Sequence, residues 1–192
     1  MKVNEIFCSI QGEGHNTGIA MAFVRLAGCN LRCDFCDTQY ALDEPGEEMD
    51  ERRIIRQIKE YDVQWVCVTG GEPFIQDLSP LTSLLKEEGF KIHIETNGTL
   101  LFKDVVFDWL TVSPKCRTKP DLKVLDNASE IKFVVDSAGA LQDVDKFERW
   151  GMHHYLQPVY NKAEMQDLCV DFIKKNPKWR LSLQMHKLIG IA

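Results

Sequence analysis

Three cysteines stand close together near the start of the chain, at Cys29, Cys33 and Cys36. Thiolates are soft ligands that select iron–sulfur clusters or zinc. The C-x3-C-x2-C spacing offers three thiolates and includes no fourth ligand. On a four-iron cluster, three protein ligands leave one iron open to bind another molecule. These residue types at this spacing therefore indicate a metal centre that can carry out chemistry.

A structural zinc site is the chief alternative for the same cysteines. Structural zinc takes four ligands, and Cys8, Cys67 or His15 could supply the fourth from another part of the fold. A disulfide framework is less favoured, because the seven cysteines are odd in number and the first residues contain no apolar export signal. Both features favour a reducing, cytoplasmic setting.

A second motif, Thr-Gly-Gly-Glu-Pro over residues 69–73, directly follows the apolar run 65–68. Consecutive glycines let the backbone approach a ligand closely, and α/β folds place their sites at the carboxyl ends of parallel strands. A simple tight turn would explain Gly-Gly alone. The whole motif, in a chain that also carries the cysteine triplet, favours a binding loop.

The 192 residues suit one compact domain, 1–192, and the net charge of −6 argues against a surface that coats nucleic acid. No apolar run approaches the roughly 20 residues that a membrane span needs. Apolar segments of strand length alternate with segments of helical periodicity, which predicts βαβ units, a parallel sheet and a short, incomplete (β/α) barrel. We expect strands over 21–26, 65–69, 91–95, 109–112, 131–135, 154–156 and 180–184, and helices over 50–61, 78–88, 138–150 and 162–175.

The triplet, with Phe35 before its last cysteine, and the Gly-Gly-Glu-Pro turn resemble the radical S-adenosylmethionine (SAM) superfamily. The resemblance implies that the cysteines hold a [4Fe–4S] cluster whose open iron binds SAM through its amino and carboxylate groups. An electron passed through the cluster would cleave SAM to a 5′-deoxyadenosyl radical, which abstracts a substrate hydrogen.

Further segments resemble the 7-carboxy-7-deazaguanine synthase family within that superfamily. They are residues 9–14, 23–33, 36–38, 113–115, 157–160 and 184–192. The resemblance implies a lyase that converts 6-carboxy-5,6,7,8-tetrahydropterin to 7-carboxy-7-deazaguanine, with release of ammonia, in queuosine or other 7-deazapurine biosynthesis. It also implies Mg²⁺, recycled SAM, a homodimer and an electron donor such as a flavodoxin or ferredoxin, with neither nucleic acid nor membrane as a partner.

The resemblance assigns roles residue by residue, and two of them have a physical reading. Glu13 can accept hydrogen bonds from pterin N–H groups, and Arg25 offers a planar fork to the substrate carboxylate. The substrate-binding residues are Ile10, Gln11, Gly12, Glu13, Arg25, Thr69, His186 and Ala192. The SAM-binding residues are Phe35, Cys36, Asp37, Gly71, Glu72, Glu95, Ser113, Pro114, Lys115, Gln157, Pro158, Val159 and Tyr160, and Thr38 binds Mg²⁺.

Plainer readings stay open for several of these residues. Thr38 alone reads as a helix cap or turn residue, the Ser-Pro and Gln-Pro pairs as turns, and a lone histidine such as His186 is ordinarily structural. At the level of the whole chain, the alternatives are an activase that installs a glycyl radical on a partner protein and a zinc- or cluster-stabilised binding module. Cys8, Cys67, Cys116 and Cys169 have no assigned role.

Overall fold

The computed structural model describes every residue except 44, 116–117, 161 and 192. Nine strands of the described chain form one sheet in the order β3-β1-β2-β4-β5-β6-β7-β8-β9. The strands are β1 (Lys2–Ile10), β2 (Ala20–Leu26), β3 (Glu47–Glu48), β4 (Trp65–Gly70), β5 (Lys91–Thr96), β6 (Trp109–Val112), β7 (Glu130–Val135), β8 (His153–Pro158) and β9 (Trp179–Leu181).

The sheet is parallel from β2 through β9, and β1 runs antiparallel to its neighbours β2 and β3. Within the described residues the end strands β3 and β9 do not pair, so the sheet curves without closing. The predicted incomplete (β/α) barrel is confirmed. Its carboxyl ends gather on one rim, which is where parallel α/β folds place their sites.

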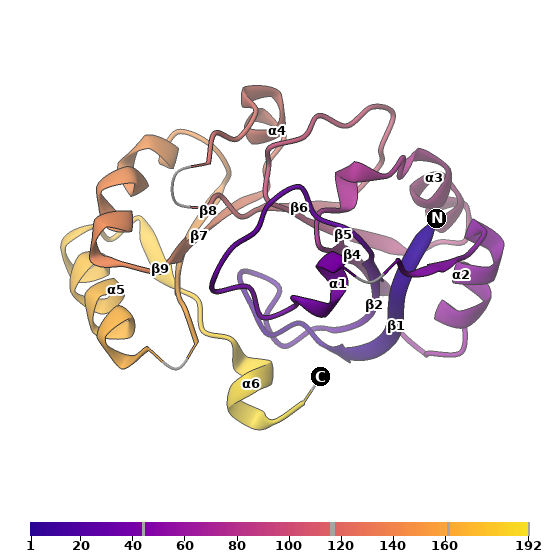
Figure 1. The fold of residues 1–192 in the computed structure, drawn as a ribbon, viewed down its shortest axis with the longest axis horizontal. Coiled ribbons are helices and arrows are strands. Elements are labelled where there is room, and N and C mark those ends of the chain that lie inside the picture. Colours follow the sequence, from indigo (N-terminus) through magenta and orange to yellow (C-terminus); the bar gives the residue numbers. More distant parts are fainter. Residues whose placement is uncertain (44, 116–117, 161, 192) are drawn as a thin grey trace.

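Helices cover the outer face of the curved sheet, and α6 lies at its open side (Figure 1). The outer helices are α2, α3, α4 and α5, and α6 lies near the C-terminal end (Figure 1). The helical segments are α1 (Tyr40–Asp43), α2 (Glu51–Ile58), α3 (Ser79–Glu87), α4 (Leu122–Asp126), α5 (Ala163–Lys175) and α6 (Met185–Ile189), with the 3₁₀ segments η1 (Pro73–Ile75) and η2 (Ala138–Phe147). No helix in the described part of the chain is both long and apolar enough to span a membrane.

Strand β7 separates the apolar core beneath the helices from the interior of the barrel. Successive side chains of a strand point to opposite faces. Ile131, Phe133 and Val135 therefore join the apolar core beneath the helices. Glu130 and Lys132 lie on the other face and are also buried, with 1% and 3% of their surface exposed. The inside of the barrel is thus lined with polar groups.

The seven expected strands all form, with small differences at their ends. The last one is shorter than expected, since β9 stops at Leu181 and the chain then enters α6. The helix expected over 138–150 is a 3₁₀ segment. Strand β1 was missed because it is half-exposed along most of its length and carries no continuous apolar run.

The loop 11–19 and α6 meet at the open side of the barrel. The backbone N–H of Met185 donates to the carbonyl oxygen of Gly12 over 3.0 Å. A Cβ at Gly12 would stand 2.2 Å from Nδ1 of His186, so a side chain there would push α6 away. The loop 11–19 and α6 thus form one continuous wall at the open side of the barrel.

Candidate active site

A cavity of about 410 Å³ opens at the carboxyl ends of the parallel strands. Cys29, Cys33 and Cys36 line it together with residues from the loop 11–19, from the strands and from α6. The sequence motifs are thereby brought to one cavity, although they are separated along the chain by more than a hundred residues.

The cysteine loop and the Gly-Gly-Glu-Pro turn are packed directly against each other. The Glu72 N–H donates to the carbonyl oxygen of Gly28 over 2.9 Å. A Cβ at Gly71 would lie 2.1 Å from that same oxygen, so only glycine fits there. Partial burial raises the pKa of the Cys29 and Cys33 thiols, which favours the neutral thiol when no metal is bound. Three thiols on one cavity wall fit the donor set of an iron–sulfur cluster with an open position.

The fourth zinc ligands considered above lie elsewhere. Cys8 is exposed on β1 and Cys67 is buried within β4. His15 is stacked on Trp109 and His153, with ring centroids 4.7 and 4.2 Å away. Within the described residues, no cysteine besides the triplet lines the cavity. A four-cysteine or Cys3His zinc site built from these residues is therefore not favoured.

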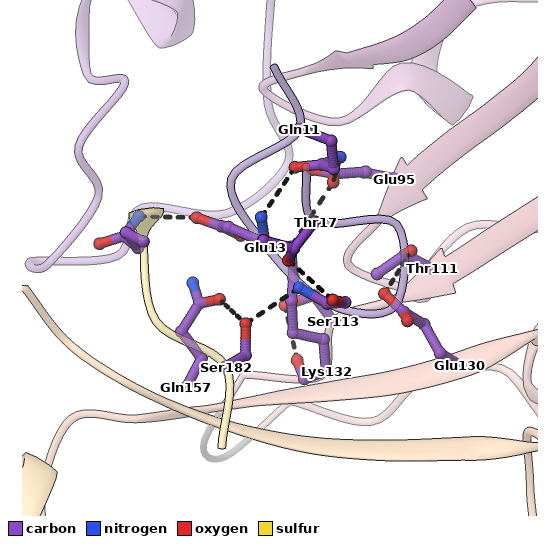
Figure 2. Close-up of polar contacts among 12 residues, drawn as sticks. Gln11, Glu13, Thr17, Glu95, Thr111, Ser113, Glu130, Lys132, Gln157 and Ser182 are labelled. Carbon is purple, nitrogen blue, oxygen red and sulfur yellow. Dashed lines mark hydrogen bonds and ion pairs between the residues drawn. The ribbon is translucent and has the colours of Figure 1, made fainter. Parts of the chain in front are cut away.

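A buried group of charges forms the floor of the cavity (Figure 2). The Lys132 ammonium is ion-paired with Oε2 of Glu13 and lies 3.5 Å from Oε1 of Glu95. Gln11 joins the two acids: its Nε2 donates to Glu95 over 2.9 Å, and its Oε1 accepts from the Glu13 N–H over 3.1 Å. The four side chains come from the loop 11–19 and from β5 and β7.

The titration of this group follows from its pairing. Burial by itself lowers the pKa of Lys132, but the carboxylates of Glu13 and Glu95 outweigh burial and raise that pKa above its ordinary value. Burial by itself raises the pKa of Glu95, but Lys132, His93 and Gln11 lower it overall. The Lys132 ammonium thus favours the ionised form of Glu95.

A second polar layer lies beneath this floor. Thr111 Oγ1 and the His15 N–H donate to the two oxygens of Glu130, each over 2.8 Å. His93 is fully buried, and burial lowers its pKa to about 4. Its Nε2 lies 2.7 Å from Thr111 Oγ1. These contacts hold the loop 11–19 inside the barrel.

The opposite wall carries Ser113, Lys115 and the segment 157–160. Lys115 Nζ donates to Ser113 Oγ over 2.8 Å, and Ser113 Oγ donates to the carbonyl oxygen of Lys132 over 2.9 Å. Oε1 of Gln157 accepts from Ser182 Oγ over 2.9 Å. Burial lowers the pKa of Lys115.

Side chains of α6 and the residue before it tie that helix to both motifs at the cavity mouth. Gln184 Nε2 lies 2.8 Å from Glu13 Oε1 and 2.9 Å from Asp37 Oδ2. Lys187 is ion-paired with Asp37 and lies over the ring of Tyr160, 5.2 Å from its centroid. Burial raises the pKa of Asp37, but Lys187 and Gln184 together bring it well below its usual range. The cysteine loop, the loop 11–19 and α6 are thus connected.

Arg25 points from β2 toward the same cavity. Its Nε donates to Glu5 Oε1 over 2.7 Å, and Tyr40 Oη donates to the same oxygen over 2.7 Å. Its guanidinium carbon lies 5.6 Å from the ring centroid of Phe7. Glu5 fixes the guanidinium through Nε, which leaves the terminal amino groups for a bound anion.

Comparison with known proteins shows the family to which this chain belongs. Residues 24–167 match the model of the radical SAM superfamily. A 7-carboxy-7-deazaguanine synthase from Bacteroides thetaiotaomicron is 42% identical over 191 residues, which is 99% of this chain and 98% of the relative. One from Escherichia coli K12 is 34% identical over 221 aligned positions, covering 99% of this chain and 98% of the relative. This chain belongs to the 7-carboxy-7-deazaguanine synthase family of the radical SAM superfamily.

A solved member of the family has the same fold. The crystal structure of QueE from Escherichia coli superimposes with a TM-score of 0.84 at 30% identity, over 96% of this chain and 94% of that chain. The chain is thus a radical SAM enzyme, and membership of the superfamily implies a [4Fe–4S] cluster and SAM as cofactors. The glycyl-radical activase and the zinc-stabilised module are correspondingly disfavoured.

Most residues singled out from the sequence lie around the cavity. Glu72 and Pro114 are not among the lining residues, and Ala192 and Cys116 lie outside the described residues. The Glu72 carboxylate is buried and accepts from Thr96 Oγ1 and from two backbone N–H groups, so it braces the turn. The lining residues predicted from the sequence are Ile10, Gln11, Gly12, Glu13, Arg25, Cys29, Cys33, Phe35, Cys36, Asp37, Thr38, Thr69, Gly71, Glu95, Ser113, Lys115, Gln157, Pro158, Val159, Tyr160 and His186.

The sequence analysis missed several lining residues, among them Lys132, Gln184 and Lys187. A signal for Lys132 was present, because Glu-Ile-Lys-Phe-Val-Val alternates charged with apolar residues in a strand with helices on its outer side. Such charges must face a polar interior. Gln184 and Lys187 carry no comparable signal, since their positions depend on how α6 packs.

A buried set of potential metal ligands belongs to the same interior. Ligand atoms of Cys67, His93 and Glu95 lie within 4.8 Å of one another. Glu95, however, faces Lys132, and His93 is hydrogen-bonded to Thr111. An ammonium next to the site opposes binding of a cation, so we interpret this set as part of the polar interior.

Proposed function

We propose that this chain converts 6-carboxy-5,6,7,8-tetrahydropterin to 7-carboxy-7-deazaguanine with release of ammonia. The proposal follows the name shared by its relatives. The observation that carries it is the single cavity onto which both the cysteine triplet and the Lys132–Glu13–Glu95 group open. The first supplies a place for a cluster, and the second supplies fixed polar groups for a flat, nitrogen-rich ring.

The protein's part is to hold the two cofactors beside the substrate. Cys29, Cys33 and Cys36 would hold the cluster, and Gly71 lets the backbone come close to the amino acid part of SAM. When bound, cluster and SAM supply the one-electron chemistry that removes a hydrogen atom from the substrate. Ser113, Lys115 and the segment 157–160 form the wall that would contact SAM, and the loop 11–19 and α6 limit access of water to it.

The residues that bind the substrate are inferred from their charge and hydrogen-bonding capacity. Glu13 and Glu95 accept hydrogen bonds from the N–H groups of the pterin ring. Arg25 pairs with the substrate carboxylate in a charge-assisted contact. Glu95 was assigned to SAM from the sequence, but it shares Gln11 and Lys132 with Glu13. We therefore propose that Glu95 binds the pterin.

We further propose Mg²⁺ at Thr38, at the edge of the cavity. The Thr38 hydroxyl donates to Asp37 Oδ1 over 3.0 Å, so an oxygen-rich corner lies beside the cysteine loop. Mg²⁺ prefers oxygen ligands and keeps several waters, which suits a site shared with the substrate carboxylate. Thr38→Ala should lose most Mg²⁺-dependent turnover. Full Mg²⁺-dependent turnover in that variant would rule this site out.

Anaerobic reconstitution with iron and sulfide tests the main proposal. We expect a brown protein that binds SAM and forms 7-carboxy-7-deazaguanine from carboxytetrahydropterin, identified by mass spectrometry. Replacing Cys33 with Ala should abolish cluster binding, whereas Cys169→Ala, in α5 away from the cavity, should leave it unchanged. A colourless protein that contains one zinc ion would overturn the proposal.

We also propose that residues 1–192 act as a single domain, as a homodimer, in the cytoplasm, with electrons supplied by a flavodoxin or ferredoxin and without nucleic acid or membrane as partners. The continuous sheet supports the single domain, the free cysteines of the described residues support the cytoplasm, and the net charge of −6 argues against nucleic acid. The homodimer and the electron carrier follow from the family resemblance. Sedimentation of the reconstituted enzyme and turnover with each electron carrier test them.

A further inference from the structure

Lys132 is a deeply buried charge of the cavity, and it belongs to none of the motifs identified from the sequence. Its side chain is 4% exposed, whereas Glu13 and Glu95 are 13% and 22% exposed. The ammonium therefore lies behind the two carboxylates, on the protein side, and the carboxylates face the cavity. A lysine in this place contacts the two carboxylates, and the carboxylates contact the ligand.

We propose that Lys132 is a positioning residue that aligns Glu13 and Glu95 as a two-carboxylate acceptor for the amino-pyrimidinone edge of the pterin and keeps Glu95 ionised. This inference rests on the proposed function and adds the residue that sets the protonation state of its substrate site. The pterin edge presents neighbouring N–H donors, and an ionised carboxylate offers only acceptors. A protonated carboxyl group would place its O–H donor against an N–H donor of the pterin.

The charge balance explains why one lysine is needed. Two carboxylates in a low-dielectric site disfavour each other's ionisation, and one of them takes up a proton unless a cation is near. The other buried lysine of the cavity, Lys115, donates to Ser113 on the opposite wall. Glu130, in the layer beneath, is held by Thr111 and the His15 N–H. Lys132 is thus the cation in contact with both acids among the described residues.

The geometry leaves acceptor capacity for a ligand. Glu13 uses Oε2 for Lys132 and Oε1 for Gln184, and each carboxylate oxygen has two lone pairs. On Glu95, both Gln11 and Lys132 contact Oε1, so Oε2 faces no donor among the described residues. The protein contacts set the direction of both carboxylates before the substrate arrives, which lowers the entropy that binding must overcome.

The experiment measures binding and proton release together. Oxidised 6-carboxypterin keeps the amino-pyrimidinone edge and the carboxylate of the substrate, and calorimetry at pH 7 in two buffers of different ionisation enthalpy gives the protons exchanged on binding. With the anaerobically reconstituted, SAM-loaded enzyme we expect no net proton exchange. In Lys132→Met we expect binding weaker by about tenfold to a hundredfold, with release of up to one proton per pterin.

Two further variants keep the test decisive. Lys132→Arg retains a cation and should show no proton release. Lys132→Met combined with Glu95→Gln removes the second acid, so the proton release seen in Lys132→Met should disappear. SAM affinity of each variant reports whether the rest of the cavity is intact.

The outcomes separate this inference from the proposed function. If the parent enzyme neither binds 6-carboxypterin nor turns over the tetrahydropterin, the proposed function fails. If the parent enzyme binds it and Lys132→Met does so equally well, or more weakly without proton release, Lys132 has only a structural role and the inference is overturned.

Discussion

At the scale of single residues, burial decides which groups serve the site and which support it. His93 and Glu95 are two positions apart on β5 and point to the same side. Glu95 is held ionised by Lys132, whereas His93, one layer deeper, stays neutral because burial lowers its pKa to about 4. A buried neutral histidine makes the folded protein sensitive to acid.

The pH dependence of stability tests the state of His93. Its unfolded pKa is near 6.5 and its folded pKa about 4, so between these values the unfolded chain binds a proton that the folded protein does not. Stability should fall as pH drops below 6.5, with about 2 kcal/mol of the loss at pH 5 due to His93. Urea unfolding of His93→Gln should show a correspondingly flatter profile from pH 6.5 to 5. His153→Gln, at a half-exposed position, is the control and should change the profile less; an unchanged slope in His93→Gln would contradict the assignment.

A glycine substitution tests the contact between the two motifs. A Cβ at Gly71 would meet the Gly28 carbonyl oxygen at 2.1 Å, and that oxygen belongs to the backbone and cannot rotate away. Gly71→Ala should lower the free energy of unfolding by about 1–3 kcal/mol and reduce both iron content and SAM affinity after reconstitution. Gly139→Ala, with no atom within 4 Å of the added Cβ, should do neither. Equal behaviour of the two variants would show that the contact is not needed.

At the scale of elements, α6 is short and leaves no residue fully buried, yet it completes the cavity. Its stability comes from polar links at its start and middle, with Gln184 before it and Lys187 within it, rather than from an apolar face. A helix of five residues cannot persist on its own. The loop 11–19 and the cysteine loop therefore hold it in place, and substrate bound between them should tighten the arrangement.

Lys187→Met tests this link. The variant removes the ion pair with Asp37, which is partly exposed and adds at most about 1 kcal/mol to overall stability. We expect a melting temperature close to that of the parent and a several-fold higher KM for the pterin, because α6 is less firmly docked. Lys174→Met, which removes an exposed pair with Asp171 on α5, is the matched control. A KM that rises equally in both variants would point to a general charge effect.

At the scale of the whole molecule, the open side of the barrel and the active site are the same place. The sheet does not close between its end strands within the described residues, and the loop 11–19 and α6 fill the opening (Figure 1). Residues that close the barrel also line the cavity. Ligand binding and global stability should therefore be coupled.

Thermal unfolding and hydrogen exchange test that coupling. With SAM and 6-carboxypterin each about 100-fold above its Kd, linkage adds about 2.7 kcal/mol per ligand, so one ligand should raise the melting temperature by about 5 to 10 °C. Exchange should slow chiefly over 11–19, 28–38 and 184–190. Helix α5 lies on the outside and should gain less protection, limited to what the higher global stability gives. Uniform protection across the whole chain would argue against a local coupling.

Short-range patterns of the chain determined much of this protein. The alternation of apolar strands with amphipathic helices predicts the parallel sheet, since each pattern follows from the geometry of its own element. The cysteine triplet, Gly71 and the loop carrying Gln11 and Glu13 are contiguous motifs, so they could be assigned before any packing was known. Most of them do line one cavity.

Only the tertiary structure decided which charged side chains pair with those motifs and which segments close the cavity. Lys132 is 119 residues away from Glu13 along the chain, and its pairing depends on the curvature of the sheet. Gln184 and Lys187 reach Glu13 and Asp37 only because α6 crosses the open side. The Glu72 carboxylate braces its own turn through Thr96 and the Asn97 N–H. These contacts join distant segments, and no local periodicity records which side chains a folded barrel brings within hydrogen-bonding distance.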